Sequence, residues 1–261
     1  MPGERKELPV MYKFSIAPSD FLAPGFEDKL SLCHRTGCAY VELSDIIDQT
    51  FLGDMDGEAI EDMRNLLIDY GKVISLITYT GEISNREHFR KLLRNCHLLG
   101  VKAIKVSCDG YDTVPAAAED ITECALDAKC YGICLCVENR HDSVLARNKD
   151  MELLVKSAGE NVCTIFNPLS YAYMRAHPFF HEFYGSKLKN NIAFLRVNDG
   201  LFCERKPMLP GQGNAEIKEL ASILLSRSFD GYFSFTDYFG QMSWEKLQEY
   251  IAAFKSLLKQ M

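Results

Sequence analysis

An apolar segment that ends abruptly in polar residues is the first feature of the chain that could do chemistry. Residues 132–143 read GICLCVENRHDS, and the apolar run ends at Glu138, followed by Asn139 and His141. A carboxylate at the end of a buried strand can transfer protons or bind a metal ion. An ordinary strand that meets water gives the same pattern, so the neighbours of Glu138 decide between the two interpretations.

Several other apolar runs contain or end in polar side chains. These residues are Glu42, Lys105, Asn167, Arg196, Asp199, Thr236 and Asp237. Structural alternatives exist for many of them: Glu42 can pair with Lys105 or Arg196, and Lys105 is either that cation or an amine for covalent chemistry. Asp199 and Asn167 each precede a turn-forming residue and can simply belong to turns.

Arg196 is harder to explain structurally, because it interrupts the apolar run AFLRVND. Burying a guanidinium without an anionic partner is costly. The sequence therefore predicts that a carboxylate, a phosphate or both lie beside Arg196.

A glycine-containing loop, LPGQGNAEIKEL, precedes a predicted helix at residues 215–228. Gly211 and Gly213 free the backbone there, and N–H groups at the start of a helix can hold an anion. The loop lies between the last two predicted strands, where barrels often bind phosphate. We therefore count both glycines among the candidate substrate-binding residues.

The elements that must position these residues alternate between strands and helices. Eight apolar runs, expected as strands, cover residues 12–18, 39–44, 72–81, 102–108, 133–138, 162–167, 191–199 and 231–237. The helices expected after them cover residues 25–37, 56–71, 84–100, 116–132, 149–159, 177–188, 215–228 and 243–261. Eight strand–helix units predict the α/β class and a (β/α)8 TIM barrel, formed by a single domain over residues 1–261. An open doubly wound sheet is less favoured, because SIAPSDF after the first strand lacks the glycine-rich dinucleotide fingerprint.

Composition narrows the class of protein. The 261 residues carry a net charge of −7, which disfavours nonspecific nucleic-acid binding. The N-terminus shows no apolar signal segment, and no apolar run reaches the ~18 residues of a membrane span. The ten cysteines form no CxxC pair and are expected to be reduced core thiols. We expect a cytoplasmic protein with no membrane or nucleic-acid partner.

The segments together resemble those of the xylose isomerase-like barrel family, which includes sugar phosphate isomerases/epimerases and enzymes of the endonuclease IV type. The resemblance spans nearly the whole chain and is carried by AYVELS, GVKAIKVS, CLCVENRHDS, FNPLSYAY, FLRVNDG, LPGQGNAEIKEL and FDGYFSF, in that order. It implies a site at the carboxyl ends of the strands. The endonuclease chemistry needs a cluster of metals, and most of its histidines and carboxylates are absent here.

The resemblance also implies four metal ligands, and this chain departs from them. Sugar-epimerising members typically use glutamate, aspartate, histidine and glutamate on strands five to eight; these positions fall at Glu138, Asn167, Arg196 and Thr236. A charge pair at ~4 Å is worth roughly 4 kcal/mol at an effective dielectric of 20, and Arg196 opposes a divalent ion about twice as strongly. We predict that no cofactor is bound. The alternative is an altered site of Glu138, Asn167 and Asp237 that holds Mn, Mg or Zn.

The resemblance favours an isomerase or epimerase that moves a proton next to the carbonyl of a sugar or sugar phosphate, in carbohydrate metabolism. Glu138, Asp237 and Asp199 are the candidate catalytic residues. The candidate substrate-binding residues are Glu42, Lys105, Asn139, His141, Asn167, Arg196, Thr236, Gly211 and Gly213. The alternatives are a non-catalytic carbohydrate-binding barrel and a lyase or dehydratase. The aromatic segment 170–185 suits a lid, a packed helix or the contact of a homo-oligomer.

Overall fold

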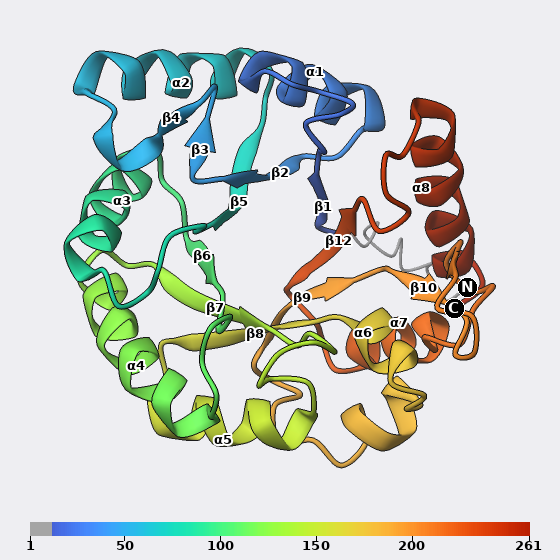
Figure 1. Ribbon diagram of the computed structural model, residues 1–261. Helices are drawn as coiled ribbons and strands as arrows, with labels where there is room; N and C mark the ends of the chain where they lie inside the picture. The colour runs from blue at the N-terminus through green and yellow to red at the C-terminus, as the bar shows by residue number, and fades with distance from the viewer. Residues whose placement is uncertain (1–11) are drawn as a thin grey trace, which may run out of the picture.

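Strands and helices alternate along the chain because apolar runs of strand length are separated by amphipathic segments that end in glycine or polar residues. The computed structural model describes residues 12–261, and its strands close into a barrel of eight parallel strands (Figure 1). Each predicted strand is present and neighbours the strand that precedes it, with the first and last strands pairing to close the ring. The predicted (β/α)8 class is confirmed.

The eight barrel strands are short and end at the same side of the barrel. They are β1 (Phe14–Ala17), β2 (Tyr40–Ser44), β5 (Val73–Thr78), β6 (Ala103–Val106), β7 (Cys134–Glu138), β8 (Val162–Phe166), β9 (Ile192–Arg196) and β12 (Tyr232–Thr236).

The outer ring of helices covers the barrel, as Figure 1 shows. The helices are α1 (Phe26–Thr36), α2 (Gly57–Asp69), α3 (Arg86–Leu98), α4 (Val114–Cys130), α5 (Asn148–Ala158), α6 (Pro168–Tyr173), α7 (Ile217–Ser226) and α8 (Trp244–Leu258). The helices bury apolar side chains in the main core; in α2 these are Ile60, Met63 and Leu67.

Additional elements sit in the loops at the carboxyl ends of the strands. They are the two-stranded pairs β3 (Ile46–Ile47) with β4 (Thr50–Phe51) and β10 (Asp199–Gly200) with β11 (Pro207–Met208), the 3-10 helix η1 (Leu52–Asp54) and the π-helix η2 (Pro178–Phe183). The helix expected over residues 177–188 is thus a shorter π-helix. α6 begins directly after β8. Pro168 lies in its first turn, where the backbone N–H group that proline lacks would have no partner within the helix.

The interior of the barrel has two layers, because alternate residues of a strand point to the same face. The layer at the amino ends is apolar and contains Ala103, Cys136, Ile165 and Phe194. Two residues further along the same strands lie Lys105, Glu138, Asn167 and Arg196. The polar residues therefore form the second layer, at the carboxyl ends.

Residues 1–11 of the predicted domain lie outside the described residues, and so does most of the N-terminal segment in which the sequence predicts no signal. Among residues 12–261, no helix is long and apolar enough to cross a membrane. The ten cysteines are free thiols, as expected, but Cys130 and Cys203 are exposed and do not belong to the core.

Candidate functional site at the carboxyl end of the barrel

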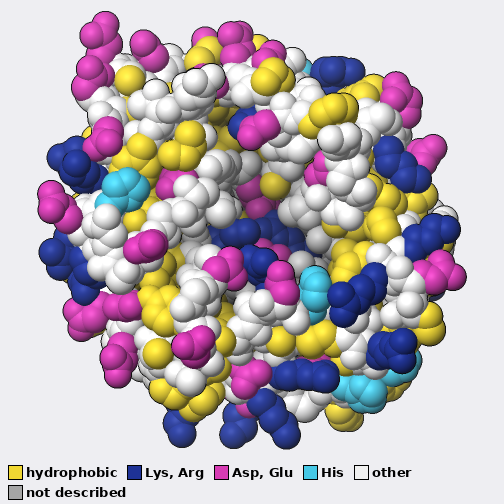
Figure 2. Space-filling model, viewed as in Figure 1, with side chains coloured by type: hydrophobic (Ala, Val, Ile, Leu, Met, Phe, Trp, Pro, Cys, Tyr) yellow, Lys and Arg dark blue, Asp and Glu magenta, His cyan; other side chains and the backbone are white. Residues whose placement is uncertain are grey.

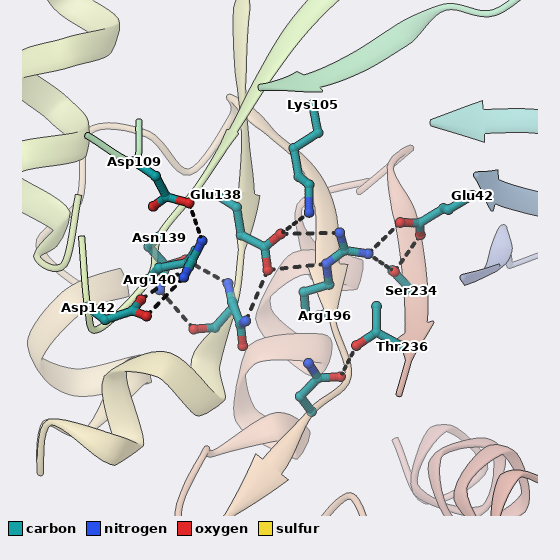
Figure 3. A network of polar contacts seen from close by, with 12 residues as sticks. Glu42, Lys105, Asp109, Glu138, Asn139, Arg140, Asp142, Arg196, Ser234 and Thr236 are labelled. Carbon is teal, nitrogen blue, oxygen red and sulfur yellow. Dashed lines mark hydrogen bonds and ion pairs between the residues drawn. The ribbon is translucent and has the colours of Figure 1, made fainter. Parts of the chain in front are cut away.

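Arg196 lies at the centre of a buried ionic network that joins both sides of the barrel (Figure 3). Its Nη1 atom donates to Glu42 Oε2 over 2.5 Å and also to the hydroxyl of Ser234. Its Nε and Nη2 atoms donate to the two carboxylate oxygens of Glu138, over 3.4 and 3.2 Å. The anionic partner predicted for Arg196 is therefore a pair of glutamates.

Glu138 has two further partners on neighbouring strands. The Nζ atom of Lys105 is 3.3 Å from Glu138 Oε2, and the Nδ2 atom of Asn167 donates to Glu138 Oε1 over 3.0 Å. The other amide atom of Asn167, Oδ1, is buried and has no hydrogen-bond partner among the described residues. A buried acceptor in that state lacks the hydrogen-bond donor that such groups usually have.

Burial and charge together determine which groups are ionised. The side chains of Arg196 and Glu42 are each 3% exposed, and that of Glu138 is 11% exposed. Burial alone would raise the pKa of Glu138, but Arg196 and then Lys105 outweigh it and lower that pKa to about 2. Burial opposes the charge on Arg196 as well, yet Glu138 and Glu42 raise its pKa above the usual value. The Glu138–Arg196 pair is therefore ionised at neutral pH.

A cavity of about 250 Å³, which we call the mouth cavity, opens beside Glu138. Its polar lining consists of Thr78, Thr80, Lys105, Ser107, Asp109, Glu138, Arg140 and Ser143. Arg140 spans one edge, where it donates to Asp109 over 2.7 Å and to both carboxylate oxygens of Asp142 over 3.1 and 2.9 Å. Figure 2 shows basic and acidic side chains together in the central hollow of this face.

Asp199 does not take part in this network. Its Oδ1 atom accepts the backbone N–H groups of Gly200 and Ala215, and its Oδ2 atom accepts those of Gly211 and Gly213, over 2.8–2.9 Å. Burial raises the pKa of this carboxyl, and the four N–H groups act in the opposite direction. These contacts account for the burial of the Asp199 carboxylate in the loop. The catalytic role of Asp199 and the substrate contact of the two glycines stay predictions.

Asp237 likewise accepts backbone N–H groups of its own loop, from Gly240 and Met242. These hydrogen bonds give Asp237 partners within its own loop and outside the network around Glu138. The altered metal site that would combine Glu138, Asn167 and Asp237 stays a prediction, and both carboxylate oxygens of Asp237 already accept backbone N–H groups.

Three other predicted binding residues lie at the strand ends in supporting positions. The side chain of Asn139 bridges to the backbone of Asn167 through two hydrogen bonds of 2.8 and 2.7 Å. Thr236 donates to Asn198 over 3.1 Å. The ring of His141 packs edge-on against Tyr173 of α6, with 5.8 Å between the centroids.

Two residues that the sequence does not single out, Ser234 and Arg140, belong to the site. Ser234 lies two residues before Thr236 on β12, so strand alternation could have indicated that it faces the barrel interior. It is fully buried, and its hydroxyl lies 2.5 Å from Glu42 Oε1. Arg140 follows β7, and nothing in the sequence indicates that it pairs with Asp109, which follows a different strand.

The donor set does not fit the divalent ion that the resemblance implies. Of the four positions, one offers a carboxylate, and Arg196 places two donor nitrogens on it. Among residues 12–261, no group of three or more histidine, cysteine, aspartate or glutamate side chains could hold a metal ion. A divalent ion needs several oxygen or nitrogen ligands and a surplus of negative charge, which this layer does not supply.

Comparison with known sequences gives no match: no family model and no curated protein resembles the chain. Solved structures do match over nearly the whole length. A xylose isomerase domain containing protein from Salmonella typhimurium is 20% identical with a TM-score of 0.70, covering 94% of this chain and 97% of its own.

Two further matches are enzymes. D-psicose 3-epimerase from Clostridium cellulolyticum is 13% identical with a TM-score of 0.73, covering 95% of this chain and 98% of its own. The probable 3-DHS dehydratase AsbF from Bacillus anthracis is 13% identical with a TM-score of 0.74, covering 93% and 98%. The chain therefore has the xylose isomerase-like barrel fold, and identities this low show the fold alone.

Proposed function

We propose that this chain, whose fold is that of the xylose isomerase-like barrels, is a metal-independent isomerase or epimerase of a small sugar-like carbonyl compound. The observation that carries the proposal is the position of Lys105 and Arg196, which flank the one retained carboxylate, Glu138. Positive charge from the chain itself thus lies where sugar epimerases of this fold are expected to hold a metal ion. The epimerases among the structural matches support the reaction class.

Lys105 is the group that we assign to the carbonyl oxygen of the substrate. Its side chain is 25% exposed, lines the mouth cavity and contacts Glu138 through a single hydrogen bond of 3.3 Å. Removing a proton next to a carbonyl moves negative charge onto the carbonyl oxygen. An ammonium group held beside that oxygen stabilises this charge without a metal ion.

We assign to Glu138 the removal of the proton next to the carbonyl. With a pKa of about 2 it is a weak base as long as Lys105 and Arg196 both contact it. When Lys105 turns to the substrate oxygen, one of the two lowering charges is withdrawn, and the pKa of Glu138 rises. Substrate binding itself would then increase the basicity of the carboxylate.

Solvent deuterium exchange tests this assignment. We expect the purified chain to incorporate deuterium next to the carbonyl of D-psicose, D-fructose or D-tagatose, as followed by NMR. Lys105→Met should lower the exchange rate by about 10²-fold or more, because the oxyanion loses its stabilising charge. Lys13→Met, at the opposite end of the barrel, is the matched control and should keep the wild-type rate.

A specific observation favours a second function, the binding of the same compound without turnover. The other carboxylates are engaged: Glu42 by Arg196 and Ser234, and Asp199 and Asp237 by backbone N–H groups. Among these candidate carboxylates of residues 12–261, none is then free to act on the opposite face of the substrate. A rise in the thermal midpoint with ligand, but no deuterium exchange, would assign the chain to binding. Exchange in the wild-type protein that Lys105→Met leaves intact would instead contradict the role of Lys105.

A further inference from the structure

The loop between β9 and α7 contains an anion-binding arrangement that the chain itself already fills. Four backbone N–H groups, from Gly200, Gly211, Gly213 and Ala215, converge on the carboxylate of Asp199. The Asp199 side chain belongs to a residue with no exposed surface. A phosphate group would have to displace a covalently attached carboxylate to use these donors, so this loop is closed to a phosphorylated ligand.

The basic side chains around the mouth cavity are also engaged. Lys105 pairs with Glu138, Arg196 with Glu42 and Glu138, and Arg140 with Asp109 and Asp142. The cations at this mouth are thus outnumbered by the carboxylates that contact them. A phosphate ester carries about −1.5 to −2 charges at pH 7 and would meet repulsion from those carboxylates.

What the cavity does offer suits hydroxyl groups. The hydroxyl groups of Thr78 and Ser107 can donate hydrogen bonds at the wall of the mouth cavity; that of Ser107 also accepts the N–H group of Asp109. The hydroxyl of Ser143 already donates to the carbonyl of Arg140 and keeps acceptor capacity. Outside the lining of the cavity, but bonded to Glu138 through the same amide, Asn167 Oδ1 is a buried acceptor without a partner among the described residues. The volume of about 250 Å³ is slightly below the range of about 300–1,000 Å³ that is typical of drug-sized ligands.

From these observations we infer that the ligand is an uncharged, polyhydroxylated carbonyl compound and that its phosphate esters are excluded. The inference rests on the proposed function, because it names the substrate class of the same site. It replaces the sugar-phosphate substrate, which the resemblance includes and the glycine loop favours.

Paired ligands test the inference. Isothermal titration of the purified chain is carried out with D-fructose, D-tagatose and D-psicose, and with the 6-phosphate of each sugar. We expect at least one free sugar to bind and its phosphate to bind at least tenfold more weakly. Inorganic phosphate at millimolar concentration should leave the thermal midpoint unchanged, because Asp199 occupies the loop amides.

A variant with one carboxylate fewer shows whether repulsion from the carboxylates at the mouth excludes the phosphate esters. Asp142→Asn removes one of the two carboxylates that engage Arg140. The ratio of phosphate to free-sugar affinity should then rise severalfold. Asp230→Asn, which alters an exposed ion pair with Lys13 at the amino end of the barrel, makes the same change in net charge and should leave the ratio unchanged.

The outcomes separate the inference from the proposed function. Binding of a phosphate ester as tightly as its free sugar would overturn the exclusion and leave an isomerase or epimerase possible. Failure of every free sugar and every phosphate to bind would remove the proposed function, and the inference with it. A ratio that rises equally in the two aspartate variants would show that local repulsion at the mouth is not the cause.

Discussion

Arg196 connects two carboxylates that burial would otherwise penalise. Its side chain and that of Glu42 are 3% exposed, and Glu138 is 11% exposed. Replacing a whole buried ion network by apolar residues can be nearly neutral, but removing one member leaves the others unpaired and costs about 3–5 kcal/mol. The network is therefore sensitive to the loss of its central cation.

Arg196→Met should lower the free energy of unfolding at pH 7 by about 3–5 kcal/mol, as measured by urea denaturation, because Glu42 and Glu138 remain buried without their cation. Arg140→Met is the control. Arg140 is 45% exposed and pairs with Asp109 and Asp142 at the surface, so its loss should cost no more than about 1 kcal/mol.

The stability difference between the wild-type chain and Arg196→Met should depend on pH, and the pKa of Glu138 sets the direction. In the folded wild-type chain the pKa of Glu138 is about 2, against a usual value of 4.5. The contribution of Glu138 to the free energy of unfolding is therefore complete above about pH 5 and is lost as the pH falls toward 2. In the variant, Glu138 loses the more effective of the two charges that lower its pKa, so that pKa rises from about 2 and the ionised carboxylate contributes less stability at pH 7. The difference between the two proteins should thus shrink on acidification. A constant difference between pH 7 and pH 4 would contradict the assignment.

At the residue scale, the sequence predicts which kind of partner a buried side chain requires, but not which residue provides it. The polar arginine in AFLRVND indicates a buried anion, and the network supplies it. The task of Asp199 could not be predicted, because its partners are backbone N–H groups up to 16 residues further along the chain. Their positions depend on the folded loop and not on residue type.

At the scale of elements, periodicity predicts the eight strands and the helices that alternate with them. It fails where local backbone geometry decides: α6 begins at Pro168, and the segment expected as a helix to residue 188 forms a π-helix over Pro178–Phe183. The loop between β9 and α7 contains a glycine that a larger residue cannot replace without a shift of the backbone. A Cβ atom on Gly213 would lie 2.6 Å from the backbone nitrogen and oxygen of Gly200 and even closer to Asp199.

Gly213→Ala should therefore lower the free energy of unfolding by about 1–3 kcal/mol, because the added methyl group forces the backbone apart and weakens the hydrogen bonds to Asp199. Chemical denaturation measures this loss. Gly57→Ala is the matched control, since a Cβ atom at the first position of α2 meets no atom within 4 Å.

The control variant should stay within about 0.5 kcal/mol of the wild-type chain. Equal stability of the two alanine variants would show that the loop adapts to the methyl group. The N–H groups would then not be held rigidly on Asp199, and the closed state of the loop would lose its support.

At the scale of the whole molecule, barrel closure joins residues that are far apart in sequence. Glu42 and Arg196 are 154 positions apart and form a hydrogen bond of 2.5 Å across the interior. The order of the segments predicts that both belong to one ring. Their contact could not be predicted from spacing, because it depends on strand register and on which residues reach the same layer.

The ionic network inside the barrel also predicts the effect of metal ions on the chain. Because Arg196 and Lys105 already neutralise the interior carboxylates, neither EDTA nor added Mn²⁺, Mg²⁺ or Zn²⁺ should change the thermal midpoint or the deuterium exchange rate. Combining Asn167→Asp, Arg196→His and Thr236→Glu removes the guanidinium and supplies the ligand types that the resemblance implies beside Glu138. Metal analysis after dialysis should find about one divalent ion per chain in this triple variant and none in the wild-type chain. One tightly held ion in the wild-type chain, lost on Glu138→Gln, would refute metal independence.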